Sequence, residues 1–138
     1  WLGVASQTIA VNPETAGQSR VTQAFRVEKD APLTTTPIAN KGLLFLWADN
    51  GIVTCVDTNT GGLVWRKRVG GKYFGSPVIA KNRIYCLSTA GEVVVLAASR
   101  EYELLGRNQL GEASHSTPAV ANGRMFLRTF SKLISISH

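Results

Sequence analysis

The residues best suited to catalysis in this chain are a histidine and the two serines beside it. His115 lies between Ser114 and Ser116, and an imidazole next to a hydroxyl is the pairing that activates a serine nucleophile. Such a pair needs an acid to orient the histidine, and Glu112 is the only carboxyl group close by in the sequence. We therefore interpret His115 as a polar loop residue and predict no catalytic residues.

The two cysteines do not form a metal or redox motif. Cys55 and Cys86 are 31 residues apart, which fits neither the short spacings of zinc sites nor the CxxC pair of redox proteins. Both lie in apolar segments, Ile52–Val56 and Ile84–Leu87, so free buried thiols are the first expectation. A disulfide between them stays open if the compartment is oxidising. No metal ligand is predicted.

Charge and hydropathy argue against two further classes of protein. Fifteen Lys and Arg residues against nine Asp and Glu give a net charge of +6. The basic residues are scattered apart from Arg66–Arg68 and nearby Lys72, and no aromatic stacking pattern accompanies them, so we predict no nucleic-acid partner. The longest apolar runs, Leu43–Ala48 and Val93–Ala98, are six residues each. A membrane-spanning helix needs about 20, so no transmembrane segment is predicted.

A repeat of about 40 residues organises the chain. Three segments begin with a hydroxyl residue and a proline, continue as a short apolar stretch and a polar turn, and end in an apolar stretch bearing an aromatic residue. Their prolines are Pro37, Pro77 and Pro118, spaced by 40 and 41 residues. Gly51 and Gly91 repeat the interval of 40. This period is typical of propeller blades and of two-helix repeats.

Local pattern favours strands in each repeat. The apolar segments are short, rich in β-branched and aromatic residues, and separated by hairpin signals such as Asp49-Asn50-Gly51 and Asn122-Gly123. Each repeat is therefore expected to form about four antiparallel strands, which is one blade of an all-β propeller. The predicted strands are 7–11, 22–28, 37–39, 43–48, 52–57, 63–69, 77–80, 83–88, 92–97, 103–109, 118–121, 124–129 and 132–137.

These strands predict a β-propeller of four-stranded antiparallel blades, present as a partial ring of about three blades. Residues 1–30 are expected to end a preceding blade, 31–71 and 72–112 to form two blades, and 113–138 to form an incomplete last blade. Stable rings have about four to eight blades, so this chain alone is not expected to close one. The remainder of a longer chain, or further copies in a homo-oligomer, would complete it.

One turn carries a family motif. Asp57 can accept backbone N–H bonds in a hairpin, Gly61 supplies a positive φ, and Trp65 returns as an apolar anchor. With Thr60, these residues match the tryptophan-docking motif of quinoprotein-like propellers. Over residues 22–136 the chain resembles propellers with PQQ-type repeats, and is similar to the C-terminal portion of the BamB-like outer-membrane assembly proteins.

The resemblance implies radial blades in which Trp65 packs against the neighbouring blade. In the second repeat the motif is incomplete, because Leu96–Glu103 lacks its Asp, Gly and Trp. The resemblance also implies a bacterial protein that is exported to the periplasm or cell envelope.

Two functions follow from the resemblance. Dehydrogenases of this type hold PQQ and Ca²⁺ with oxygen ligands and a catalytic carboxylate, and often stack adjacent cysteines on the cofactor. Here the cysteines are separated, and turns account for Asp49 and Asp57. We therefore predict a non-catalytic scaffold that binds a protein partner and no cofactor, with PQQ and Ca²⁺ considered only in a closed ring. The alternative is part of a PQQ-binding dehydrogenase whose cofactor site lies largely outside this chain. A sensor propeller attached to another domain is also open.

Repeat register predicts where a partner would bind. The segment before the first strand of each blade is expected at one rim of the ring, and loops held by rigid sheets commonly bind partners. The predicted binding rim consists of Lys72, Tyr73, Phe74, Ser114 and His115.

Overall fold

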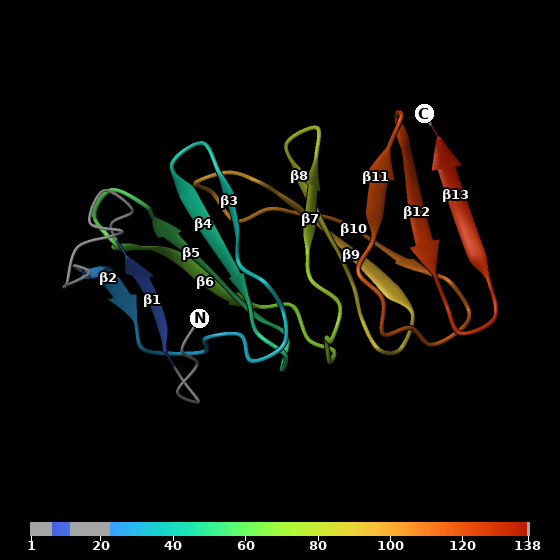
Figure 1. The fold of residues 1–138 in the computed structure, drawn as a ribbon, viewed down its shortest axis with the longest axis horizontal. Helices are drawn as coiled ribbons and strands as arrows, with labels where there is room; N and C mark the ends of the chain where they lie inside the picture. The colour runs from blue at the N-terminus through green and yellow to red at the C-terminus, as the bar shows by residue number, and fades with distance from the viewer. Residues whose placement is uncertain (1–6, 12–22, 138) are drawn as a thin grey trace.

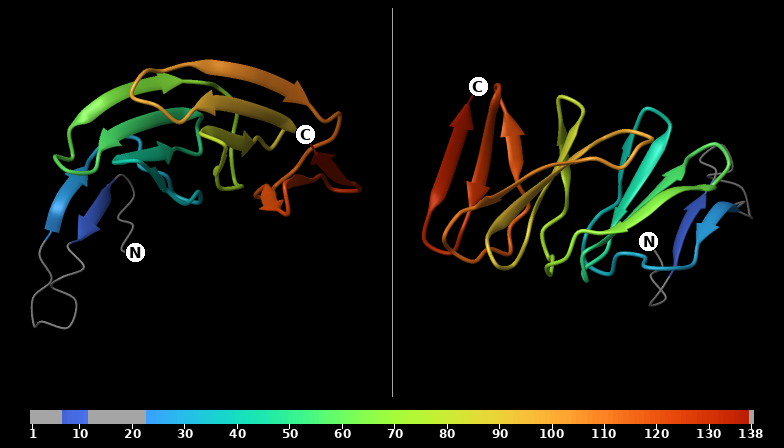
Figure 2. Two further views of the ribbon diagram at one scale, coloured as in Figure 1. Left: turned by 90° about the horizontal axis from the view of Figure 1, so that it is seen from above. Right: turned by 180° about the vertical axis from the view of Figure 1, so that it is seen from behind.

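The computed structural model describes residues 7–11 and 23–137, which form four antiparallel sheets placed side by side (Figure 1). Seen from above, the sheets follow one another along a curved row in sequence order (Figure 2). Within the described ranges every regular element is a strand, so none of these residues forms an apolar helix that could span a membrane. The predicted all-β propeller fold, as a partial ring, is confirmed.

The two central sheets have four strands each, hydrogen-bonded in sequence order. The first contains β3 (Ile38–Asn40), β4 (Leu43–Trp47), β5 (Ile52–Asp57) and β6 (Leu63–Arg68). The second contains β7 (Val78–Ala80), β8 (Arg83–Leu87), β9 (Glu92–Ala97) and β10 (Leu104–Gln109).

Two smaller sheets flank the central pair. One pairs β1 (Thr8–Val11) with β2 (Gln23–Val27), and the other contains β11 (Ala119–Ala121), β12 (Arg124–Arg128) and β13 (Leu133–Ser137). All of these strands begin and end within one residue of the predicted bounds. The division of the chain into blades at residues 30, 71 and 112 stays a proposal, and each position lies in a connection between sheets.

The core lies between the sheets. The middle strands of the central sheets, β4, β5, β8 and β9, are largely buried, because a neighbouring sheet covers each of their faces. By contrast, β6 and β10 run along the convex side of the row in Figure 2 and are mostly exposed. A strand that is covered on both faces reads as a continuous apolar run, as in Leu43–Ala48.

The hydroxyl residue before each proline links one repeat to the next. The Thr36 N–H donates to Ser76 Oγ at 2.9 Å, and the Ser76 N–H donates to Thr117 Oγ1 at 2.9 Å. The Ser76 and Thr117 hydroxyls, which lie just before the short strands β7 and β11, therefore each satisfy a backbone N–H of the preceding repeat. This shared contact explains why a Ser or Thr recurs before the proline of each repeat.

Glycines at the hairpin tips allow the connections between sheets to lie against the hairpin backbone. Gly51 and Gly91 have φ of +76° and +81°, and their carbonyls accept the N–H groups of Val69 and Leu110, both at 2.8 Å. A Cβ at Gly91 would collide with the carbonyl oxygen of Glu112 in the β10–β11 connection. The glycine is therefore required both by its backbone conformation and by the space around it.

We expect Gly91→Ala to destabilise the chain much more than Gly123→Ala. Both glycines have positive φ, which costs alanine about 1–2 kcal/mol, but nothing lies within 4 Å of a Cβ at Gly123. At Gly91 the backbone of Glu112 must also move, which should bring the total loss to about 3 kcal/mol or more. Urea denaturation followed by circular dichroism measures both losses. Equal losses for the two variants would contradict this account.

Candidate functional site

The tryptophan-docking motif forms the turn between β5 and β6. Asp57 Oδ1 accepts the Asn59 N–H at 2.9 Å, and the Asp57 carbonyl accepts the Gly61 N–H at 2.8 Å. The Thr60 hydroxyl accepts the N–H two residues later at 3.1 Å. Gly61 has φ of +71°, and a Cβ there would collide with the Phe25 side chain on β2. This tight turn fixes the point at which β6 begins.

Trp65 on β6 joins its own sheet to the next one. Its side chain is only 8% exposed, and its ring lies 5.9 Å from that of Phe45 on β4, centroid to centroid. In the next sheet, the ring of Tyr102 stands edge-on at 5.4 Å, and the indole N–H donates to the Ser99 carbonyl at 3.1 Å. Trp65 thus contributes both apolar contact and a satisfied hydrogen bond at the sheet-to-sheet junction.

The first residue of the motif contacts the same turn of the next sheet. Arg100, between β9 and β10, donates to Asp57 Oδ2 at 2.8 Å. The Arg100 guanidinium and the Asn59 N–H stabilise the carboxylate and hold the pKa of Asp57 below its usual range. Asp57 and Trp65 therefore both bind the β9–β10 turn of the neighbouring sheet.

Two of the five residues predicted for the binding rim are buried, so the rim prediction is wrong for Tyr73 and Ser114. The Tyr73 ring packs edge-on against Trp47 at 5.2 Å, and burial raises the pKa of its hydroxyl. The Ser114 hydroxyl donates to the Arg128 carbonyl at 2.5 Å. Both side chains point inward because a backbone hydrogen bond ties each residue to a hairpin of the preceding sheet. The Tyr73 N–H donates to the Asp49 carbonyl at 3.0 Å, and the Ser114 N–H donates to the Thr89 carbonyl at 3.2 Å.

The remaining rim residues, Lys72, Phe74 and His115, are exposed. The Phe74 and His115 rings stand edge-to-face with centroids 4.9 Å apart, and His115 stands edge-to-face with Phe130 at 5.1 Å. Phe74, His115 and Phe130, here called the aromatic rim, come from three connections along the lower edge of Figure 1.

Phe130 was not predicted from the sequence. It lies at the β12–β13 hairpin tip, at the position that Asp49 occupies in the first hairpin. An aromatic residue where polar turn residues are the rule is the signal that could have revealed it.

The described residues hold no group of three or more His, Cys, Asp and Glu side chains arranged to bind a metal ion. Cys55 on β5 and Cys86 on β8 are free and buried, so they form no disulfide. Burial raises the pKa of the Cys55 thiol to about 11 and also raises the pKa of Cys86. Both thiols therefore stay protonated near neutral pH and act as small apolar core groups.

Comparison with known proteins identifies the family. The family described as "Outer membrane protein assembly factor BamB" matches residues 5–102. The chain belongs to this family. The BamB proteins of Escherichia coli (strain K12) and Yersinia pestis are 25% and 23% identical over 111 and 105 residues, or 78% and 76% of this chain. The chain spans only 28% and 26% of their lengths. The resemblance to PQQ-type, BamB-like propellers is thus confirmed.

Solved structures give the same fold. The crystal structure of BamB from Moraxella catarrhalis superposes with a TM-score of 0.68 at 16% identity, covering 83% of this chain and 36% of that one. A europium-containing methanol dehydrogenase gives a TM-score of 0.60 at 13% identity, covering 73% and 21%. At these identities the likeness shows the propeller fold alone.

Trp65→Ala is expected to destabilise the chain by about 3–5 kcal/mol, because it leaves a cavity between two sheets. Trp65→Phe keeps a ring in the junction and loses the bond to the Ser99 carbonyl, so a smaller loss of about 1–2 kcal/mol is expected. Urea denaturation measures both values. If the phenylalanine variant lost as much stability as the alanine variant, ring packing would not be the main contribution.

Asp57→Asn is expected to lower the free energy of unfolding at pH 7, and this loss should become smaller as the pH falls. The folded-state pKa of Asp57 lies below its unfolded value, so its contribution is complete above the unfolded pKa, about 4. The contribution is lost as the pH falls through the folded pKa. Urea midpoints of Asp57→Asn and the parent should therefore converge as the pH falls below the unfolded pKa and through the lower folded pKa.

The same comparison in an Arg100→Gln background is the control, because that background lacks the cation which lowers the pKa. The pH-dependent difference should shrink there. A difference between Asp57→Asn and the parent that stayed constant from pH 7 to pH 2 would contradict the ion pair's role.

Proposed function

We propose that this chain is part of a non-catalytic, protein-binding propeller that serves outer membrane protein assembly in the bacterial cell envelope. Membership of the BamB family supports the cellular role, since the named relatives are outer membrane protein assembly factors. The chain spans about a quarter of those relatives, so it would supply one arc of the binding scaffold. The observation that carries the proposal in this chain is the aromatic rim.

The aromatic rim has the composition of a binding anchor. Phe74 is 50% exposed and Phe130 is 64% exposed, and His115 lies between them in contact with both. Adjacent exposed aromatic side chains mark interaction sites, because a partner removes a large apolar area from water at little conformational cost. Exposed Lys72 adds positive charge beside Phe74, so the partner is expected to present acidic and apolar groups together.

The rim is rigid enough to bind without rearrangement. The buried Tyr73 ring fixes the connection that carries Phe74, and the buried Ser114 hydroxyl fixes the one that carries His115. The Phe130 N–H donates to the Ala113 carbonyl at 3.2 Å, which ties the β12–β13 tip to the same connection. A preorganised surface loses less entropy on binding.

The alternative function, part of a PQQ-binding dehydrogenase, fits the described residues poorly. Ca²⁺ prefers six to eight oxygen ligands. Asp49 Oδ1 already accepts the N–H groups of Leu33 and Thr34 at 3.3 and 3.2 Å, and Asp57 is paired with Arg100. These carboxylates serve the sheet connections, so we infer no PQQ or Ca²⁺ site within the described ranges.

Replacing the rim phenylalanines together, Phe74→Ser with Phe130→Ser, is expected to weaken association with the outer membrane assembly machinery at least tenfold. The variant should leave the thermal midpoint nearly unchanged, because both side chains are exposed. The measurement is the affinity for that purified machinery of the full-length propeller protein of which this chain is proposed to be a part. Leu63→Ser is the matched control, since Leu63 on β6 is also 64% exposed but lies away from the rim. Unchanged affinity in the rim variant, or an equal loss in the control, would contradict the proposal.

A further inference from the structure

The register of the first central sheet shows how Trp65 reaches the sheet-to-sheet junction. Phe45 on β4 pairs with Cys55 on β5, and Cys55 pairs with Trp65 on β6. The three residues form one row across the sheet, and successive pairs in such a row share a face. Trp65 therefore extends over Phe45 toward the next sheet.

In the second central sheet the same row ends in a glycine. Tyr85 on β8 pairs with Val95 on β9, and Val95 pairs with Gly106 on β10. The β9–β10 turn is one residue longer than the β5–β6 turn, so Gly106 takes the register position of Trp65. A Cβ at Gly106 would meet only one atom within 4 Å, the Asn108 Nδ2 at 3.8 Å, so this position has room for a side chain.

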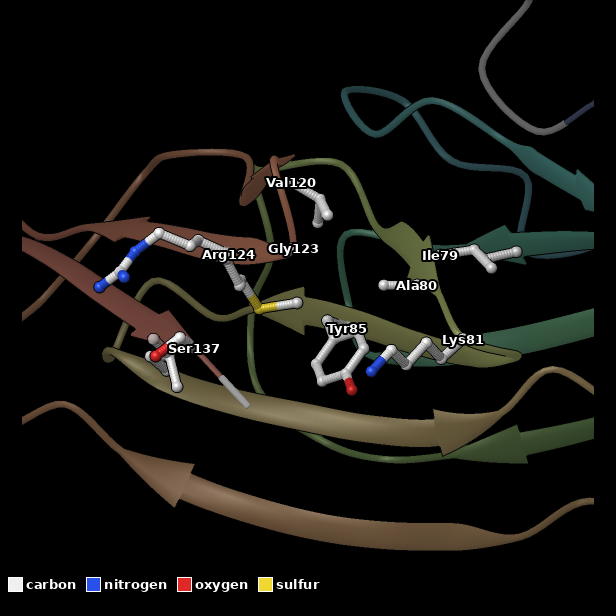
Figure 3. A pocket seen from close by; sticks show the side chains of 10 residues that line it. Ile79, Ala80, Lys81, Tyr85, Val120, Gly123, Arg124 and Ser137 are labelled. Carbon is white, nitrogen blue, oxygen red and sulfur yellow. The ribbon is translucent and has the colours of Figure 1, made fainter.

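A cavity of about 420 Å³ lies at this second junction, between the sheet of β7–β10 and the sheet of β11–β13. Its volume is within the usual range of about 300–1,000 Å³ for ligand pockets. Tyr85, the register equivalent of Phe45, lines it together with Ile79 and Val120 (Figure 3). Thus Phe45 in the first junction packs against an indole, whereas its register equivalent Tyr85 in the second junction borders a largely apolar cavity, whose lining comes from β7, β8 and the sheet of β11–β13.

We propose that this cavity binds a tryptophan side chain from an acidic segment of a partner protein. The first junction shows the chemistry that suits the space, an indole packed against an aromatic ring. The Tyr85 ring and the Met125 thioether, both in the lining, favour contact with an aromatic ring. The proposal rests on the proposed protein-binding function and adds a second contact site with its own ligand chemistry.

Charge selects the flanking residues of the partner. Lys81 and Arg124 belong to the lining, where Arg124 Nε also donates to Ser135 Oγ at 2.8 Å, and none of the lining residues that the structure describes carries a carboxylate. A tryptophan flanked by glutamates would therefore be attracted, and one flanked by lysines would be repelled. The lining residues are Ile79, Ala80, Lys81, Tyr85, Val120, Gly123, Arg124, Met125, Ile136 and Ser137.

The chain itself provides a reporter for this cavity, because Met125 is its only methionine. In protein labelled with ¹³C at the methionine methyl groups, the Met125 signal is assigned by its loss in Met125→Leu, and an indole bound nearby shifts that signal through its ring current. The probes are acetyl-Glu-Trp-Glu-amide, acetyl-Glu-Ala-Glu-amide and acetyl-Lys-Trp-Lys-amide. We expect a saturable shift with the first, none with the second, and at least fivefold weaker binding of the third at low ionic strength. Absence of a saturable shift with the first probe would overturn the proposal.

Gly106→Trp tests the register argument, with Gly106→Ala as its control. An indole at position 106 should fill the cavity as Trp65 fills the first junction, raise the thermal midpoint, and abolish the probe-induced shift of Met125. Gly106→Ala should keep the shift. A folded Gly106→Trp variant that still bound acetyl-Glu-Trp-Glu-amide like the parent would overturn the assignment. The titration of the parent chain decides the proposal even if Gly106→Trp does not fold.

The two proposals fail separately. If acetyl-Glu-Trp-Glu-amide causes no saturable shift of the Met125 signal, the cavity site is overturned, whatever affinity the rim variants have for the assembly machinery. Normal affinity of the Phe74→Ser, Phe130→Ser variant overturns the aromatic rim, while a saturable Met125 shift would still support the cavity as an indole site.

Discussion

The structure depends on one constraint, which is that a middle strand apolar on both faces must have a neighbouring sheet on each side. Strands β4, β5, β8 and β9 meet this condition only because the sheets stand in a row. The polar contacts follow the same arrangement, since the Thr36 and Ser76 N–H groups each bind the hydroxyl of the next repeat. Apolar burial supplies most of the stabilisation, and these hydrogen bonds fix the spacing and orientation of the sheets.

The incomplete docking motif of the second repeat has a structural explanation in the contacts of the β9–β10 turn. The β9–β10 turn receives the docking motif of the preceding sheet, offering the Ser99 carbonyl to Trp65 and the Arg100 guanidinium to Asp57. Its Tyr102 ring forms the wall against which the indole packs. A turn that acts as acceptor need not itself present an Asp and a Trp.

Short apolar segments and turn residues were sufficient to place the strands of the described ranges, because a buried β-strand leaves a strong apolar signal that polar turns interrupt. The direction of loop side chains was harder to predict. Repeat alignment placed Tyr73 and Phe74 together at the rim, yet the backbone bond from Tyr73 to Asp49 turns one side chain inward and leaves the other outside. The position of Gly106 was hidden for a related reason, since the extra turn residue shifts the register by one and only the strand pairing reveals it.

The aromatic rim and the cavity lie at opposite ends of the same part of the row. The rim residues are on the connections at the lower edge of Figure 1, whereas Lys81 and Gly123, which line the cavity, are on the β7–β8 and β11–β12 turns at the upper edge. A five-residue strand spans about 17 Å, so one side chain cannot occupy both sites. A partner that used both would have to place an extended segment along the junction, or present two separate anchors. Either geometry would make the combined affinity depend on the spacing of the anchors, because the second contact becomes intramolecular once the first has formed.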